Sequence, residues 1–76
     1  MSTYRFRIVS TERAVLAEHD RHLADMPAVW CELVLLSWRV PEAGAHIEVS
    51  DEAGEMIIRV GIATARATAA RTGAAA

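Results

Sequence analysis

The stretch Met26–Val40, MPAVWCELVLLSWRV, decides the fold because it carries more apolar side chains than one face of a helix can hold. At about 100° per residue, these side chains form two stripes along a helix. The first stripe consists of Val29, Trp30, Leu33, Leu36 and Val40. The second consists of Cys31, Leu35 and Trp38, with Val34 between the two stripes. The solvent side is marked only by Ala28, Glu32 and Arg39.

The second stripe predicts a partner for this helix. A helix that packs on one small sheet needs a single apolar stripe, so another surface should cover the second one. We expect a homo-oligomer, with a dimer favoured, and the interface residues are Cys31, Val34, Leu35 and Trp38. An internal explanation stays open, in which residues 14–24 or the C-terminal tail fold back over the stripe in a monomer.

The flanking residues predict where this helix begins and ends. Asp25 can accept hydrogen bonds from the free amides of the first turn, and its charge suits the positive end of the helix dipole. Pro27 falls in the first turn, where no amide is needed. Pro41 and Gly44 close the helix, because a residue before proline disfavours the helical conformation.

The N-terminal part predicts two strands. Residues 3–9 alternate with period two, which predicts a half-buried strand with Arg5 and Arg7 on its outer face. Its inner face carries Tyr4, Phe6 and Ile8. Residues 10–13 are polar and can turn. Local propensity favours a helix capped by Thr11 over the next residues, but that helix has little apolar stripe. We therefore predict that residues 14–18 form a strand beside the first one.

A hairpin is predicted around the loop Asp51–Gly54, which joins residues 45–50 to residues 55–62. A four-residue loop places only apolar pairs on the buried face: Val49 with Met56, Ile47 with Ile58, and Ala45 with Val60, following Ser50 with Glu55. The outer face then has His46 opposite Arg59 and Glu48 opposite Ile57. A three-residue loop would set Ile47 opposite Arg59. Gly54 suits the left-handed position that ends a type I turn, and Asp51 suits its first position.

Length and composition limit the possible classes of protein. The chain of 76 residues makes one domain, which we place at residues 3–62, followed by an Ala/Thr/Arg-rich tail at 63–76 that is frayed or forms a short helix. A single cysteine excludes an internal disulfide. The N-terminus has no apolar signal core, so we expect a cytoplasmic protein. The Met26–Val40 run is too short to span a bilayer, and a net charge of −2 recruits neither nucleic acid nor anionic membrane.

Three segments resemble a family of short bacterial proteins catalogued as a domain of unknown function, with many members in alphaproteobacteria. They are the opening strand at 4–9, the Leu23-Ala24-Asp25-Met26 helix start, and the hairpin at 46–54, which is similar to an Ile-x-Val-x-Asp-x-x-Gly motif. The resemblance implies an α+β fold of order β-β-α-β-β, with one helix on an antiparallel or mixed sheet. It supports the strand at 14–17. Ala24 replaces the usual proline, and the helix is more apolar than the family's. The family brings no known activity.

Candidate chemical sites have simpler structural interpretations. The run His19–His22, HDRH, matches no metal-ligand spacing and is interpreted as a solvated turn. Cys31 has no neighbouring base and is interpreted as a packed thiol. No catalytic triad, phosphate loop or paired-carboxylate motif is present in the sequence. We therefore expect neither an enzyme nor a metal or cofactor.

The function predicted from these observations is a small non-enzymatic interaction module that self-associates through its apolar helix face. The alternative is a nucleic-acid-binding or regulatory module that uses Arg5, Arg7 and Arg59 on the open sheet face. That face offers no aromatic side chain on which a base could stack. Cross-strand ion pairing with Glu48 is the simpler explanation for these arginines.

Overall fold

A computed structural model describes the backbone of residues 2–75 and the side chains of residues 2–68. Over this range the elements are β1 (Ser2–Val9), β2 (Val15–Leu23), α1 (Met26–Ser37), β3 (His46–Ser50), β4 (Met56–Gly61) and α2 (Ile62–Ala75). The four strands form one sheet in the order β2-β1-β3-β4, and each neighbouring pair is antiparallel. The predicted α+β class and the β-β-α-β-β order are confirmed, and α2 follows them.

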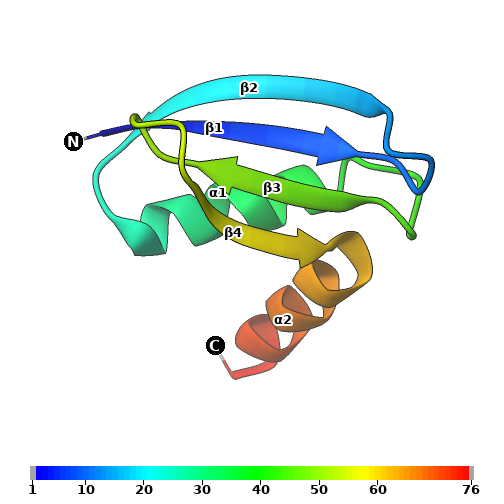
Figure 1. The fold of residues 1–76 in the computed structure, drawn as a ribbon. Helices are drawn as coiled ribbons and strands as arrows, with labels where there is room; N and C mark the ends of the chain where they lie inside the picture. The colour runs from blue at the N-terminus through cyan, green and yellow to red at the C-terminus, as the bar shows by residue number, and fades with distance from the viewer. Residues whose placement is uncertain (1, 76) are drawn as a thin grey trace.

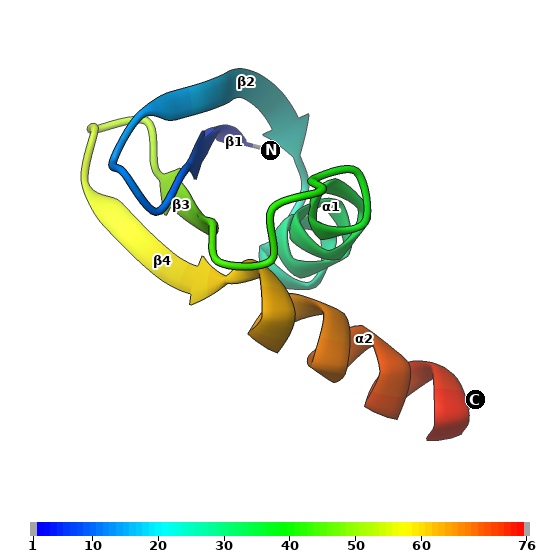
Figure 2. The same cartoon turned by 90° about the vertical axis from the view of Figure 1, so that its right-hand side faces the viewer.

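The core lies between α1 and the concave side of a curled sheet (Figures 1 and 2). The alternation in β1 is confirmed, since Phe6 and Ile8 are buried while Arg5 is exposed. The members of the core from β3 and α1 are Ile47, Val49, Val29, Leu33 and Leu36. Burying apolar side chains of this size contributes about 1.5–3 kcal/mol each. The other side of the sheet carries Arg5, Arg7, Glu48 and Arg59, and we name it the open face.

Helix α1 starts where the sequence predicts and ends earlier. Asp25 is the N-cap, and its Oδ1 accepts a hydrogen bond from the Ala28 amide at 3.0 Å. The helix ends at Ser37 with Trp38 as C-cap, so the predicted extension to Val40 is wrong. The placement of Trp30 in the buried stripe is also wrong, because its side chain is 40% exposed. At about 100° per residue Trp30 lies at the margin of the stripe, and it is not a member of the core cluster.

Strand β2 confirms that residues 14–18 are mostly extended and pair with β1, against local propensity. The strand continues to Leu23, so the interpretation of His19–His22 as a turn is wrong. In the sheet, Asp20 lies opposite Arg5 and Glu18 lies opposite Arg7. Opposite charges directly across two strands stabilise the pairing, which explains why these polar residues extend the strand.

The hairpin between β3 and β4 has a different register from the predicted one. The placement of Met56 on the buried face opposite Val49 is wrong, because Met56 lies opposite Ser50 and is 52% exposed. Asp51 and Glu55 are joined by a backbone hydrogen bond of 2.9 Å, and the Gly54 amide donates to the Asp51 carbonyl, which leaves a three-residue loop. A bulge between Met56 and Ile58 then adds one residue to β4. The observed partners are Ser50 with Met56, Val49 with Ile58, Glu48 with Arg59, Ile47 with Val60, and His46 with Gly61. The predicted pairs were wrong because a bulge, like a longer loop, restores the burial pattern from Ile58 onward.

The C-terminal segment is helical in the structure. Helix α2 starts at Ile62, whose amide donates to the Ala45 carbonyl at 2.9 Å. Ile62 and Ala65 are fully buried in the core, so the first turn packs on the body of the protein. The rest of α2 runs out beyond the sheet (Figures 1 and 2). Neither helix within residues 2–75 has the length and apolar character needed to cross a bilayer.

Candidate functional site

An exposed apolar surface lies on α1, on the side turned away from the sheet. Leu35 is 57% exposed and Trp38 is 59% exposed, although both are large apolar side chains. Cys31 is also exposed, so its interpretation as a packed thiol is wrong within a single chain. We name as the α1 apolar face the residues Trp30, Cys31, Val34, Leu35 and Trp38. Four of the five are the predicted interface residues, and Trp30 is added by the structure.

The α1 apolar face is continuous along the helix. Trp30, Val34 and Trp38 follow at intervals of four residues, so they form one row. Cys31 and Leu35 form the neighbouring row, and the two rows meet at Trp38. Glu32 is the only charged residue of α1, and it points to the side, where its Oε2 lies 3.6 Å from Nε of Arg21 on β2. The face therefore contains no charge that would favour its exposure to water.

Arg66 of α2 borders this face and was not identified from the sequence. Its Nε donates to the Ser37 carbonyl at 3.0 Å, and its Nη2 donates to the Val40 carbonyl. Its guanidinium carbon lies 5.3 Å from the centroid of the Trp38 ring. The last turn of α1 holds no basic residue, so Arg66 supplies the positive charge that the carboxyl end of a helix favours. The alanine-rich sequence around Arg66 gives no signal of this contact.

Two arginines of the open face, Arg5 and Arg7, are bound to acidic residues of β2. Arg5 Nε lies 2.9 Å from Asp20 Oδ1, and Arg7 Nη2 lies 2.9 Å from Glu18 Oε2. The hydrogen bond from Arg5 is the main cause that holds the pKa of the Asp20 carboxyl below its usual value. Glu48 was the predicted partner and is not one of these contacts. Its Oε2 lies 2.9 Å from His46 Nε2.

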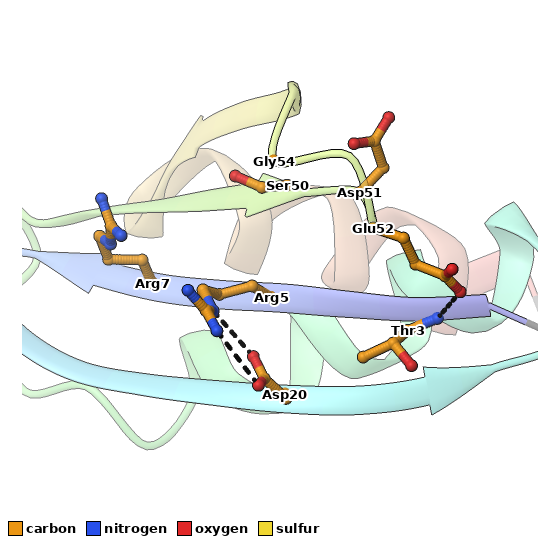
Figure 3. A pocket seen from close by; sticks show the side chains of 8 residues that line it. All are labelled: Thr3, Arg5, Arg7, Asp20, Ser50, Asp51, Glu52 and Gly54. Carbon is orange, nitrogen blue, oxygen red and sulfur yellow. Dashed lines mark hydrogen bonds and ion pairs between the residues drawn. The ribbon is translucent and has the colours of Figure 1, made fainter.

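The three predicted nucleic-acid residues do not form one cluster. Arg5 and Arg7 border a hollow of ≈ 420 Å³ beside Asp20 and the β3–β4 loop (Figure 3). Two carboxylates of this hollow already accept hydrogen bonds. Arg5 donates to Asp20, and the Thr3 amide donates to Glu52 at 2.7 Å. Arg59 borders a second hollow, which Arg7 also borders. The arginines are thus divided between two neighbouring hollows of the open face.

The histidines of β2 face different partners. His22 Nδ1 lies 2.8 Å from the Thr3 hydroxyl, which is the residue opposite it on β1. His19 lies opposite Phe6, on the other face of the sheet. Within the part of the chain that the structure describes, no three His, Cys, Asp or Glu side chains converge on a point that could hold a metal ion.

The comparisons with known proteins give no relative for this chain. The resemblance to the family of unknown function therefore stays a prediction. No protein-family model, no curated protein and no solved structure matches the chain.

Proposed function

We propose that this protein is a small non-enzymatic interaction module, and that it forms a homodimer through the α1 apolar face. The observation that carries the proposal is the exposure of Leu35 and Trp38, which are both more than half accessible on a face without charge. Monomeric proteins seldom expose a contiguous apolar patch of this kind. Tryptophan is also the residue type most often found as an anchor in interfaces.

The area of the α1 apolar face is compatible with a small dimer interface. Trp30 and Trp38 are 40% and 59% exposed, and a full indole side chain covers up to about 250 Å², so the two rings together contribute about 250 Å². A standard interface buries about 800 Å² per partner. The two rings thus cover about a third of that area, and Leu35, at 57% exposed, adds to it.

A second copy is the occupant favoured by the charges at the margin of this face. A two-fold axis near Leu35 packs α1 antiparallel to its copy, the commonest closed arrangement. Glu32 of α1 and Arg39, in the turn after α1, both lie toward β2. Glu32 lies 3.6 Å from Arg21, and Arg39 borders a hollow with Leu16 and His19. In an antiparallel pair the same flanks of the two helices meet. Glu32 of one copy then faces Arg39 of the other, and the two-fold symmetry repeats this contact a second time.

The alternative, in which residues 14–24 or the C-terminal tail cover the α1 apolar face within a monomer, has less support. Residues 15–23 are part of the sheet, and α2 contacts the apolar face through Arg66 over Trp38. Trp38 and Leu35 keep more than half of their surface exposed in this arrangement. Among residues 2–68, folding back of the chain therefore leaves most of the face without cover.

The substitution Leu35→Glu tests the proposal. The matched control is Leu16→Glu, because Leu16 is an equally exposed leucine on β2, at 54% against 57%. Size exclusion with light scattering should give twice the chain mass of 8.3 kDa for the unmodified protein and for Leu16→Glu, and 8.3 kDa for Leu35→Glu. Far-UV circular dichroism checks that both variants stay folded.

Two outcomes would contradict the proposal. One is an unmodified protein that runs at 8.3 kDa at the highest concentration tested. The other is a dimer that survives Leu35→Glu and is lost in Leu16→Glu. Salt gives an independent check, since apolar contact holds or tightens as salt increases, whereas arginine–phosphate contact weakens steeply.

A further inference from the structure

The second hollow of the open face has an excess of cationic side chains. It encloses ≈ 400 Å³ at the end of the sheet where β1 turns into β2. Three arginines border it, Arg7, Arg13 and Arg59, together with His46 and a single carboxylate, Glu48. It lies on the face of the sheet opposite α1, so it is independent of the proposed dimer surface.

Two of these three arginines have no ion-pair partner among the described side chains. Arg7 is paired with Glu18 at 2.9 Å, and Glu48 is engaged by His46 at 2.9 Å. Arg13 and Arg59 make no ion pair within 4.0 Å with any residue whose side chain the structure describes. The hollow therefore presents two free guanidinium groups beside a carboxylate that already has a partner. Such an arrangement attracts an anion that can accept several hydrogen bonds.

The backbone at Arg13 is held in an unusual conformation. Its φ is +66°, in the left-handed region that non-glycine residues seldom occupy. Ser10 fixes this turn, since its Oγ accepts hydrogen bonds from the amides of Glu12 and Ala14, and its carbonyl accepts one from Arg13. Glycine would adopt this φ without strain but would supply no guanidinium. Strain of this kind is concentrated at functional positions.

We propose that this hollow binds a phosphate group, as a compact oxyanion held by Arg13 and Arg59, with Arg7 also at its border. Planar guanidinium groups match the geometry of phosphate oxygens and give paired hydrogen bonds. An extended polyanion fits less well, because the neighbouring hollow presents the carboxylates Asp20, Asp51 and Glu52 (Figure 3). The chain's four Tyr, Phe and Trp residues lie on α1 or on the helix-covered side of the sheet, so none can stack on a base here.

The test is a titration of the ¹⁵N-labelled full chain with sodium phosphate, followed by amide chemical shifts at neutral pH. Sodium chloride at matched ionic strength is the reference titration. We expect saturable shifts at Arg13, His46 and Arg59 with phosphate and no saturation with chloride. Arg59→Gln and Arg13→Gly should each weaken the affinity about tenfold, which is the effect expected for loss of a charge-assisted hydrogen bond.

Two controls show whether a loss of phosphate affinity is specific to this hollow. Arg13→Gly removes the guanidinium and also relieves the strained φ, so its melting temperature should not fall below that of the unmodified protein. Arg5→Gln is the matched charge control, since Arg5 lies on the same face of β1 but outside this hollow. It should leave the phosphate affinity within about twofold of the original value.

The proposal is overturned by any of three results. The first is that phosphate shifts follow ionic strength without saturation. The second is that Arg5→Gln weakens phosphate binding as much as Arg59→Gln does. The third is that a single-stranded oligonucleotide of ten nucleotides causes the same shifts at far lower concentration, which would assign the face to nucleic acid.

Discussion

The guanidinium carbon of Arg66 lies 5.3 Å from the centroid of the Trp38 ring, and this contact joins the two helices. The same guanidinium donates hydrogen bonds to the carbonyls of Ser37 and Val40, at the carboxyl end of α1. One side chain of α2 thus satisfies one backbone acceptor in the last turn of α1 and one in the segment that follows the helix, and it covers part of the exposed Trp38. The position of α2 depends on this residue and on the buried Ile62 and Ala65.

Arg66→Met should therefore destabilise the protein by about 1–3 kcal/mol, because two charge-assisted hydrogen bonds and a cation–π contact are lost. The free energy of unfolding in urea measures this loss. Helical circular dichroism should fall as well, since a short alanine-rich helix is marginal without packing. Arg66→Lys keeps the positive charge but loses the planar guanidinium group that donates both hydrogen bonds. Its free energy of unfolding should therefore lie between those of Arg66→Met and the unmodified protein. Equal stability of Arg66→Met and the unmodified protein would contradict the role of this contact.

A second prediction concerns the pH dependence of the Arg5–Asp20 pair. Arg5 holds the pKa of Asp20 below its ordinary value of 3.8. The pair therefore stabilises the folded state above that value, and this stabilisation is lost as the pH falls through the lowered pKa. Arg5→Gln should raise the pKa of Asp20 toward 3.8, measured by NMR titration of the carboxyl carbon. Arg59→Gln is the control and should leave it unchanged.

The sequence predicts those parts of the fold that follow from periodicity and capping. The α1 start at Asp25, the inner face of β1 and the exposed second stripe of α1 are examples. The hairpin register was not predictable from burial, because a four-residue loop and a three-residue loop with a bulge after Met56 give the same faces from Ile58 onward. The two arrangements differ at Met56, which is exposed opposite Ser50. The full length of β2 was also missed, since the stabilising pairs Arg5–Asp20 and Arg7–Glu18 exist only once β1 lies beside it.

The residues of the candidate sites also divide into those that the sequence predicts and those that it does not. The α1 apolar face was visible as a helical stripe, and the structure adds Trp30 to it. Arg13 and Arg66 were not found, because each acts through a long-range contact or a backbone conformation that leaves no periodic signal. In a sequence, Arg13 with its left-handed backbone looks like an ordinary polar residue. The same holds for Arg66, which binds carbonyls at and beyond the end of α1.

A third prediction concerns Gly54, whose φ of +84° is left-handed. A Cβ added there would meet no atom within 4 Å, so the cost of a side chain comes from the backbone alone. Gly54→Val should reduce the free energy of unfolding by roughly 1–2 kcal/mol. Gly54→Asn should cost less, because asparagine tolerates this region. Gly61→Ala is the control: its Cβ would lie 3.9 Å from the Thr64 hydroxyl, an ordinary contact. Similar losses for Val and Asn at position 54 would contradict the argument.

The last prediction tests the antiparallel arrangement of the proposed dimer. With the axis near Leu35, Arg39 faces Glu32 of the second copy, so Arg39→Glu places two like-charged pairs in the interface. Repulsion between them should raise the dimer dissociation constant about tenfold or more, measured by analytical ultracentrifugation. Added salt should partly restore the variant dimer, because screening weakens repulsion at an exposed margin. Arg59→Glu carries the same charge change on the open face and should dimerise like the unmodified protein. An unchanged dissociation constant for Arg39→Glu, in a protein that Leu35→Glu dissociates, would reject the antiparallel geometry and keep the interface.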